Sequence, residues 1–168
     1  THAGRMSHLL GPHQEKIFNG ADLILDWGCS YGISTREIAQ LAGGKTKVIG
    51  IEIDSSRISG QPSQLKEIMF EINEQKVAEL MSLDLPVDLV CMDGYTPAFK
   101  PESFSTIIMT NNLSELIKNE KIGLDQIVSI LRENLKILKP GGQLVIGTST
   151  SSSNLLVFIK KARQKNLV

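Results

Sequence analysis

Residues 21–37 read ADLILDWGCSYGISTRE, and this stretch decides the fold. The apolar run LIL is typical of a strand buried on both faces, and Gly28 and Gly32 allow the chain to turn sharply and to approach a ligand closely. Ser34 followed by Glu37 is a capping-box pattern, so we expect the loop to end by entering a helix. The stretch therefore predicts a strand, a ligand loop and a helix in direct succession, which places the loop at the carboxyl edge of a parallel sheet.

Length and composition predict one globular domain over residues 1–168, because the chain is long enough for one hydrophobic core and short for two. A formal net charge of zero gives no basic surface for nucleic acid or for an anionic membrane, so a polynucleotide substrate is disfavoured. No apolar run approaches the roughly 20 residues of a membrane helix, and no signal peptide precedes the fold. We expect a cytoplasmic protein in which residues 1–5 are an expression remnant ahead of Met6.

The cysteines and histidines indicate neither a disulfide nor a metal site. Cys29 and Cys91 do not have the spacing of a disulfide framework, so we expect reduced thiols. A nucleophilic role for Cys29 is an alternative, but no histidine follows it in the chain to act as a base. The three histidines, at positions 2, 8 and 13, lack further ligands at metal-binding spacing.

Strand-like and helix-like segments alternate along the rest of the chain. Further apolar runs predict strands over residues 47–54, 87–93, 104–109 and 143–147. Helical periodicity predicts helices over residues 35–41 and 154–165. It also predicts a long helix from Ser63 through Met81, whose methionines face the core. A further helix begins at a capping Asp125 and has Leu135 on its apolar face. Residues 56–62 are predicted to break the chain and residues 95–103 to form a loop. This alternation predicts an α/β fold with a doubly wound, mostly parallel sheet.

Carboxylates stand at the ends of three successive predicted strands. Besides Asp26 in the glycine loop, these are Glu52 and Asp93. A carboxylate after the second strand can accept hydrogen bonds from both hydroxyls of a ribose. A dinucleotide would also need the G-x-G-x-x-G cradle for its pyrophosphate, and Ser30 and Ile33 occupy the second and third of those glycine positions. The pattern favours a nucleoside ligand over a dinucleotide. Alternatively, each carboxylate only caps backbone donors or is a solvated strand end.

At this point the sequence resembles the class I S-adenosylmethionine-dependent methyltransferases. The matching motifs are LDWGCSYG at 25–32, VIGIE at 48–52, MD at 92–93, FKPESF at 99–104 and LRENLKILKPGG at 131–142. The resemblance implies a Rossmann-like sheet of strand order 3-2-1-4-5, with S-adenosyl-L-methionine as cofactor and S-adenosyl-L-homocysteine as product. Ser30 replaces the usual central glycine, which is tolerable if that residue keeps a negative φ, and Ser105 stands where the family commonly has Asp.

The resemblance also implies which residues surround the methionine portion of the cofactor. Gly28, Ser30 and Gly32 would pass along it, and Asp26 would orient the glycine loop and reach toward the amino group. Asn111 would lie beside the sulfonium.

At the nucleoside end, the resemblance implies that Glu52 binds the ribose hydroxyls. Ile53 would flank the adenine, and Asp93 would accept a hydrogen bond from its amino group.

Family members usually continue into a final antiparallel pair of strands, which this sequence lacks. We therefore expect a C-terminal end that is truncated, and a partner chain or domain that covers the edge of the strand at 143–147.

The leading hypothesis is methyl transfer to a small-molecule acceptor by direct in-line displacement. Alignment of the reactants alone can supply roughly 7–11 kcal/mol, so the reaction needs no catalytic side chain and none is identified. Tyr31, Tyr95 and Glu115 are only nearby polar residues. One alternative is a catalytically silent domain that binds S-adenosylmethionine or serves as an interaction module in a larger protein. A nicotinamide oxidoreductase is disfavoured by the phosphate loop.

Overall fold

The computed structural model describes residues 5–59, 74–119 and 121–147. The helix expected over residues 154–165, the segment before it and the first part of the helix expected from Ser63 lie outside these residues. In chain order the elements are α1 (Arg5–Leu10), η1 (Gly11–His13), α2 (Gln14–Phe18), β1 (Leu23–Trp27), α3 (Ile33–Leu41), β2 (Lys47–Glu52), α4 (Ser55–Ser59), α6 (Glu74–Ser82), β3 (Val87–Cys91), β4 (Phe104–Thr110), α7 (Asn112–Lys118), α8 (Leu124–Lys136) and β5 (Leu138–Gly147).

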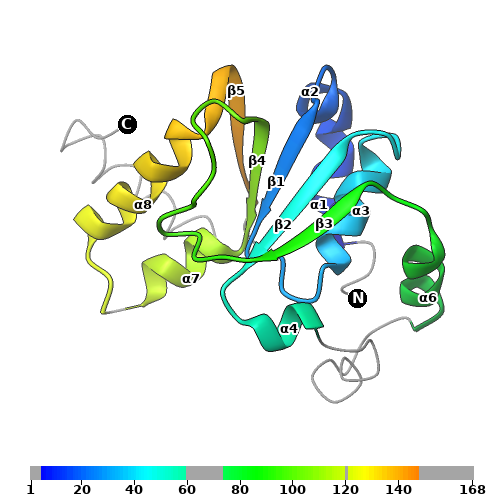
Figure 1. Cartoon of the computed structure of the whole chain (residues 1–168), viewed down its shortest axis with the longest axis horizontal. Coiled ribbons are helices and arrows are strands. Elements are labelled where there is room, and N and C mark those ends of the chain that lie inside the picture. Colours follow the sequence, from blue (N-terminus) through cyan, green and yellow to red (C-terminus); the bar gives the residue numbers. More distant parts are fainter. Residues whose placement is uncertain (1–4, 60–73, 120, 148–168) are drawn as a thin grey trace.

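The five strands form one sheet in the order β3-β2-β1-β4-β5, and every neighbouring pair is parallel. Helices α7 and α8 cover one face of the sheet, and α1, α2, α3 and α6 lie on the other (Figure 1). A sheet covered on both faces explains the continuous apolar runs of the strands. The expected Rossmann-like, doubly wound fold and its strand order are confirmed. Within the described residues, no helix has the length and apolar character needed to span a membrane.

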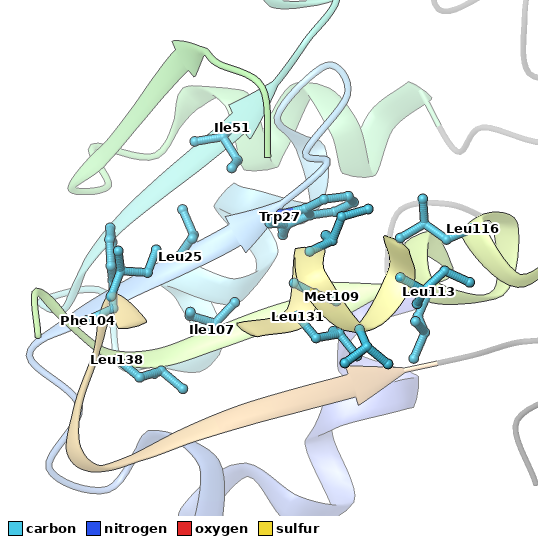
Figure 2. Close-up of a cluster of buried hydrophobic side chains, with 14 residues drawn as sticks. Leu25, Trp27, Ile51, Phe104, Ile107, Met109, Leu113, Leu116, Leu131 and Leu138 are labelled. Atoms are coloured by element: carbon cyan, nitrogen blue, oxygen red, sulfur yellow. The ribbon is translucent and has the colours of Figure 1, made fainter. Parts of the chain in front are cut away.

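Successive residues of the central strands serve two separate cores. Ile24 of β1 and Ile108 of β4 pack with the helices before and after β1. Their neighbours Leu25, Ile107 and Met109 pack with α7 and α8 in a second cluster, which Figure 2 shows between the sheet and those helices. This period of two fixes which side chains of β1 can face the site.

The capping box predicted at the start of α3 is wrong. Gly32 occupies the N-cap position in the left-handed region and makes no side-chain capping bond. Both expected capping side chains have other partners, because Ser34 donates to Asp26 at 2.8 Å and Glu37 accepts from the backbone N–H of Met6 at 3.1 Å. Tertiary contacts have replaced the local motif.

The segment predicted to break the chain after Asp54 instead forms α4 over Ser55–Ser59. One Asp54 carboxylate oxygen accepts from the backbone N–H and the hydroxyl of Ser56, at 3.0 and 2.6 Å. These bonds, the hydroxyl first, lower the pKa of Asp54. The short helix brings its own Arg57 beside the end of β2.

Further details of the helices differ from the sequence prediction. Gly123, and not Asp125, is the N-cap residue of α8. Leu135 is 47% exposed, whereas its neighbour Asn134 is fully buried. Met81 of α6 is also exposed, so this methionine is not a core residue. Helices α1, α2 and α7 were not predicted, because each has seven residues or fewer and shows little periodicity.

Candidate functional site

A cavity of about 350 Å³ lies at the carboxyl ends of β1, β2 and β3. Its walls include Trp27 and Gly28 after β1, Glu52 at the end of β2, Asp93 after β3, and Asn112 at the start of α7. The volume lies within the roughly 300–1,000 Å³ typical of small-molecule sites. Its place at the carboxyl edge, where the strand order reverses, is where open α/β sheets bind ligands.

The glycine loop has three residues in the left-handed region. Gly28, Ser30 and Gly32 have φ values of +74°, +52° and +77°. A Cβ atom on Gly28 would lie 2.6 Å from the side chain of Asn112, and one on Gly32 would lie 2.6 Å from that of Leu89. The condition under which serine would replace the central glycine without cost, a negative φ, is therefore not met: Ser30 adopts a backbone conformation that glycine adopts without strain.

Asp26 joins the loop to the helix that follows it. The carboxylate is almost completely buried, and its Oδ2 accepts hydrogen bonds from the hydroxyls of Ser34 and Thr35, both at 2.8 Å. These bonds connect the end of β1 to the first turn of α3, and the expected role of Asp26 in orienting the glycine loop stays a prediction. The described walls of the cavity do not include Asp26, so its reach toward a ligand amino group stays a prediction.

Glu52 is held in a fixed orientation at the cavity wall. It is only 8% exposed, and its two oxygens accept from the backbone N–H groups of Ser30 and Asp54, each at 3.1 Å. The Arg57 guanidinium lies 4.0 Å from the oxygen that Ser30 contacts. Burial and these donors argue against a solvated strand end. Each carboxylate oxygen has a second lone pair, so each can accept one more hydrogen bond from a ligand.

Asp93 and Ile53 line the same cavity as Glu52. One Asp93 oxygen accepts from the backbone N–H of Tyr95 at 2.8 Å, so part of the capping alternative holds for this residue. Ile53 is 68% exposed, which leaves a broad apolar surface beside two carboxylates. Such a surface is suited to a planar, partly polar ring system.

The two asparagines after β4 have different positions. Asn111 has a φ of +63° and donates its backbone N–H to the carbonyl of Gly147 at 2.7 Å. It is not among the described residues that line the cavity, whereas Asn112 is, and the Asn112 amide donates to the carbonyl of Trp27. The sequence could not distinguish the two, because the left-handed turn at Asn111 decides which side chain faces the glycine loop.

Trp27 is a cavity residue that sequence reasoning missed. Its indole N–H donates to the carbonyl of Gly94 at 3.0 Å, and its ring stacks on Tyr95 with a centroid separation of 6.2 Å and an interplanar angle of 7°. Arg57 also lines the cavity and was missed, because its segment was predicted to be irregular. The alternation of side chains along residues 23–27 could have placed Trp27 on the same face as Leu25.

The geometry does not support nucleophilic catalysis by Cys29. Its thiol is buried, and burial followed by the negative charges of Asp26 and Glu52 raises its pKa to about 12. The neutral thiol therefore dominates at physiological pH. Of the polar residues near the site, Tyr95 and Glu115 line the cavity, whereas Tyr31 packs beside a separate cluster. Across residues 5–59, 74–119 and 121–147, no cluster of three potential metal ligands occurs.

The comparison with known families agrees with this geometry. A family model described as "Methyltransferase domain" matches residues 24–142, which is most of the chain and spans the glycine loop, Glu52 and Asp93. The chain belongs to the class I S-adenosylmethionine-dependent methyltransferases. This membership implies S-adenosylmethionine as the cofactor. A search of curated protein sequences finds no significant match.

Solved structures share the fold at low sequence identity. A SAM-dependent methyltransferase from Aquifex aeolicus aligns with a TM-score of 0.61 and 15% identity, over 95% of this chain and 81% of that one. A SAM-dependent methyltransferase from Methanosarcina mazei aligns with a TM-score of 0.60 and 21% identity, over 91% of this chain and 64% of that one. This chain thus spans less than two thirds of the Methanosarcina protein. At these identities the likeness shows the fold alone.

Proposed function

We propose that this domain catalyses methyl transfer to a small-molecule acceptor. When bound, S-adenosylmethionine supplies an activated methyl group that a nucleophilic acceptor takes by direct in-line displacement. The chain's own contribution is to bind the cofactor, to align the acceptor and to exclude water. A small acceptor is supported by the neutral charge of the chain, which gives no basic surface for a polynucleotide.

The observation that carries the proposal is the state of Glu52. A buried carboxylate, held by two backbone N–H groups and facing a cavity, is pre-organised to accept the paired hydroxyls of a ribose. The donors remove the need to reorient the side chain when the ligand binds. The nearby Arg57 offsets part of the negative charge of the Glu52 carboxylate.

We further propose the roles of the remaining residues at the nucleoside end. Ile53 packs against the adenine, and Asp93 accepts from its amino group through the oxygen that Tyr95 does not contact. Both side chains line the same cavity as Glu52.

At the methionine end, we propose that the backbone of Gly28, Ser30 and Gly32 lies against the cofactor and that Asp26 fixes the loop. Asn112 takes the position beside the sulfonium that the sequence assigned to Asn111. Its side-chain amide lies over Gly28, and of the two asparagines it is the one that lines the described cavity.

The proposal is tested by equilibrium binding to the wild-type chain. Trp27 is the only tryptophan and lines the cavity, so its fluorescence should report ligand binding directly. We expect S-adenosylmethionine and S-adenosylhomocysteine to bind and NAD not to bind. Glu52→Gln should weaken binding by about 10- to 150-fold, the equivalent of roughly 1.5–3 kcal/mol for a charge-assisted hydrogen bond. Glu133→Gln, an exposed change of the same kind in α8, should leave the affinity unchanged.

Failure of both sulfonium-derived ligands to bind would contradict the proposed cofactor. An unchanged affinity in Glu52→Gln would contradict the proposed site. Once binding is established, incubation with labelled S-adenosylmethionine and a panel of metabolites separates an active enzyme from a silent domain, because only an enzyme produces labelled product.

A specific comparison keeps the second candidate function in view. A protein described as a 4+2 cyclase shares the fold, with a TM-score of 0.56 and 18% identity over 91% of this chain and 55% of that one. The fold therefore does not fix the reaction. A chain that binds S-adenosylmethionine but methylates no acceptor would support the silent or non-methylating alternative.

We also propose that an additional chain or domain pairs with β5. This strand lies at the edge of the described sheet, where unpaired backbone groups favour association. A Haloferax volcanii methyltransferase in complex with its Trm112 activator shares the fold, with a TM-score of 0.53 and 16% identity over 85% of this chain and 54% of that one. Light scattering during size-exclusion chromatography tests self-association, and a strictly monomeric chain would restrict the proposal to a different partner.

A further inference from the structure

One fully buried side chain in α8 is polar although the core around it is apolar. Asn134 is 0% exposed, and the neighbouring buried residues on its helix, Ile130 and Leu131, are apolar. Its Oδ1 is buried without a hydrogen-bond partner among the described residues. A buried acceptor without a partner destabilises the folded state, so an aliphatic residue would suit this position better for stability alone.

The amide nitrogen of Asn134 connects α8 to the segment that follows β3. Nδ2 donates to the carbonyl of Ile130, within its own helix, and to the carbonyl of Gly94, each at 2.9 Å. The Gly94 carbonyl also accepts from the indole N–H of Trp27 at 3.0 Å. Both lone pairs of this carbonyl are therefore used, one by a residue of β1 and one by a residue of α8.

This double contact fixes a three-residue stretch of the cavity wall. Gly94 lies so close to the indole that a Cβ atom would be 2.4 Å from the ring. The ring of the next residue, Tyr95, stacks on the same indole, and its backbone N–H donates to the Asp93 carboxylate. The orientation of the Asp93 carboxylate thus follows from the position of the Gly94 carbonyl.

We infer that Asn134 is a positioning residue for the nucleoside end of the cofactor site, acting through the Gly94 carbonyl on Asp93 and Tyr95. The inference rests on the proposed function for the identity of the ligand. Asn134 does not itself belong to the described cavity wall, so it acts only through the segment it holds. Its unpartnered oxygen is then the cost of placing an amide donor in an apolar core.

The test is Asn134→Leu in the full chain, with Leu135→Ala as a control in the exposed adjacent position. We expect the melting temperature of Asn134→Leu to equal or exceed that of the wild type, because an apolar side chain of similar size removes the buried amide oxygen that has no partner among the described residues, and the Gly94 carbonyl keeps its bond from Trp27. Acrylamide quenching of the sole tryptophan, Trp27, should increase, because the segment that covers its ring is held less firmly. The dissociation constant for S-adenosylhomocysteine, measured by calorimetry, should rise about three- to tenfold, as expected for one lost hydrogen bond. The control should change neither quenching nor affinity.

The outcomes separate this inference from the proposed function. Unchanged quenching and affinity in Asn134→Leu would overturn the positioning role. A large loss of stability in both Asn134→Leu and Asn134→Ala would also overturn it, because the residue would then serve only the stability of the fold. Failure of the wild type to bind S-adenosylhomocysteine would contradict the proposed function. The quenching comparison needs no ligand, so it would still decide whether Asn134 holds the segment.

Discussion

Replacing Ser30 by glycine should stabilise the protein, because Ser30 has a φ of +52°. The left-handed conformation costs an L-residue with a side chain about 1–2 kcal/mol. Glycine removes this strain, but its greater freedom in the unfolded chain offsets about 0.4–1 kcal/mol of the gain. The N–H that donates to Glu52 at 3.1 Å belongs to the backbone and is retained. The net expectation is an increase of up to about 1.6 kcal/mol in the free energy of unfolding, or up to about 6 °C in Tm for a chain of this size.

The assay is urea unfolding followed by the fluorescence of Trp27, with thermal unfolding as a second measurement. Ser30→Ala is the matched control, because alanine keeps the backbone strain and loses only the hydroxyl. It should unfold within about 0.5 kcal/mol of the wild type, as substitutions without a special mechanism usually do. A glycine variant that is less stable than the wild type, together with a neutral alanine variant, would refute the strain argument.

Three further predictions concern other parts of the molecule. Gly94→Ala should lower the free energy of unfolding by about 1–3 kcal/mol in urea titrations, because its Cβ would lie 2.4 Å from the buried indole. Gly11→Ala is the control and should be close to neutral, because a Cβ on Gly11 would have no atom within 4 Å. In a thiol assay at pH 8 the exposed cysteine should react at once and Cys29 only after unfolding, because a pKa of about 12 leaves roughly one thiolate in 10,000; two equally fast thiols would contradict this. Asp22→Asn should destabilise by less than about 1 kcal/mol at pH 7, because Asp22 forms an exposed ion pair with Lys139. The Lys139 hydrogen bond lowers the pKa of Asp22, so the contribution is present above the ordinary aspartate pKa and is lost as pH falls through the lowered one; a difference that persists in acid would count against the pair.

The architecture could be predicted because the strands are short apolar runs that alternate along the chain with segments of helical periodicity. Glu52 and Asp93 could be located from the sequence because the chain passes directly from a strand to the cavity at both places. The end of a predicted strand is known to within one or two positions, and the carboxyl ends of parallel strands lie at the same edge of the sheet. The glycine-loop spacing favoured a nucleoside over a dinucleotide, and the resemblance to the class I methyltransferases implied S-adenosylmethionine.

What could not be predicted depends on contacts between distant segments. The hydroxyl of Ser34 fits a local cap, but the buried carboxylate of Asp26 is a better partner than a backbone N–H. The positive φ of Ser30 follows from the path that the loop must take between β1 and α3, and serine itself shows no preference for it. Asn112 and Asn134 contact β1 and the segment after β3, and a pattern of helical spacing contains no information on such partners.

The central claim is that Glu52 holds the ribose of an S-adenosyl nucleoside. A crystal structure of the chain with S-adenosylhomocysteine tests it most directly. The account predicts both ribose hydroxyls at hydrogen-bond distance, roughly 2.5–3.0 Å, from the Glu52 carboxylate, with the adenine beside Ile53 and Asp93. Density for the ligand away from Glu52, or a ribose that makes no contact with that carboxylate, would contradict the account.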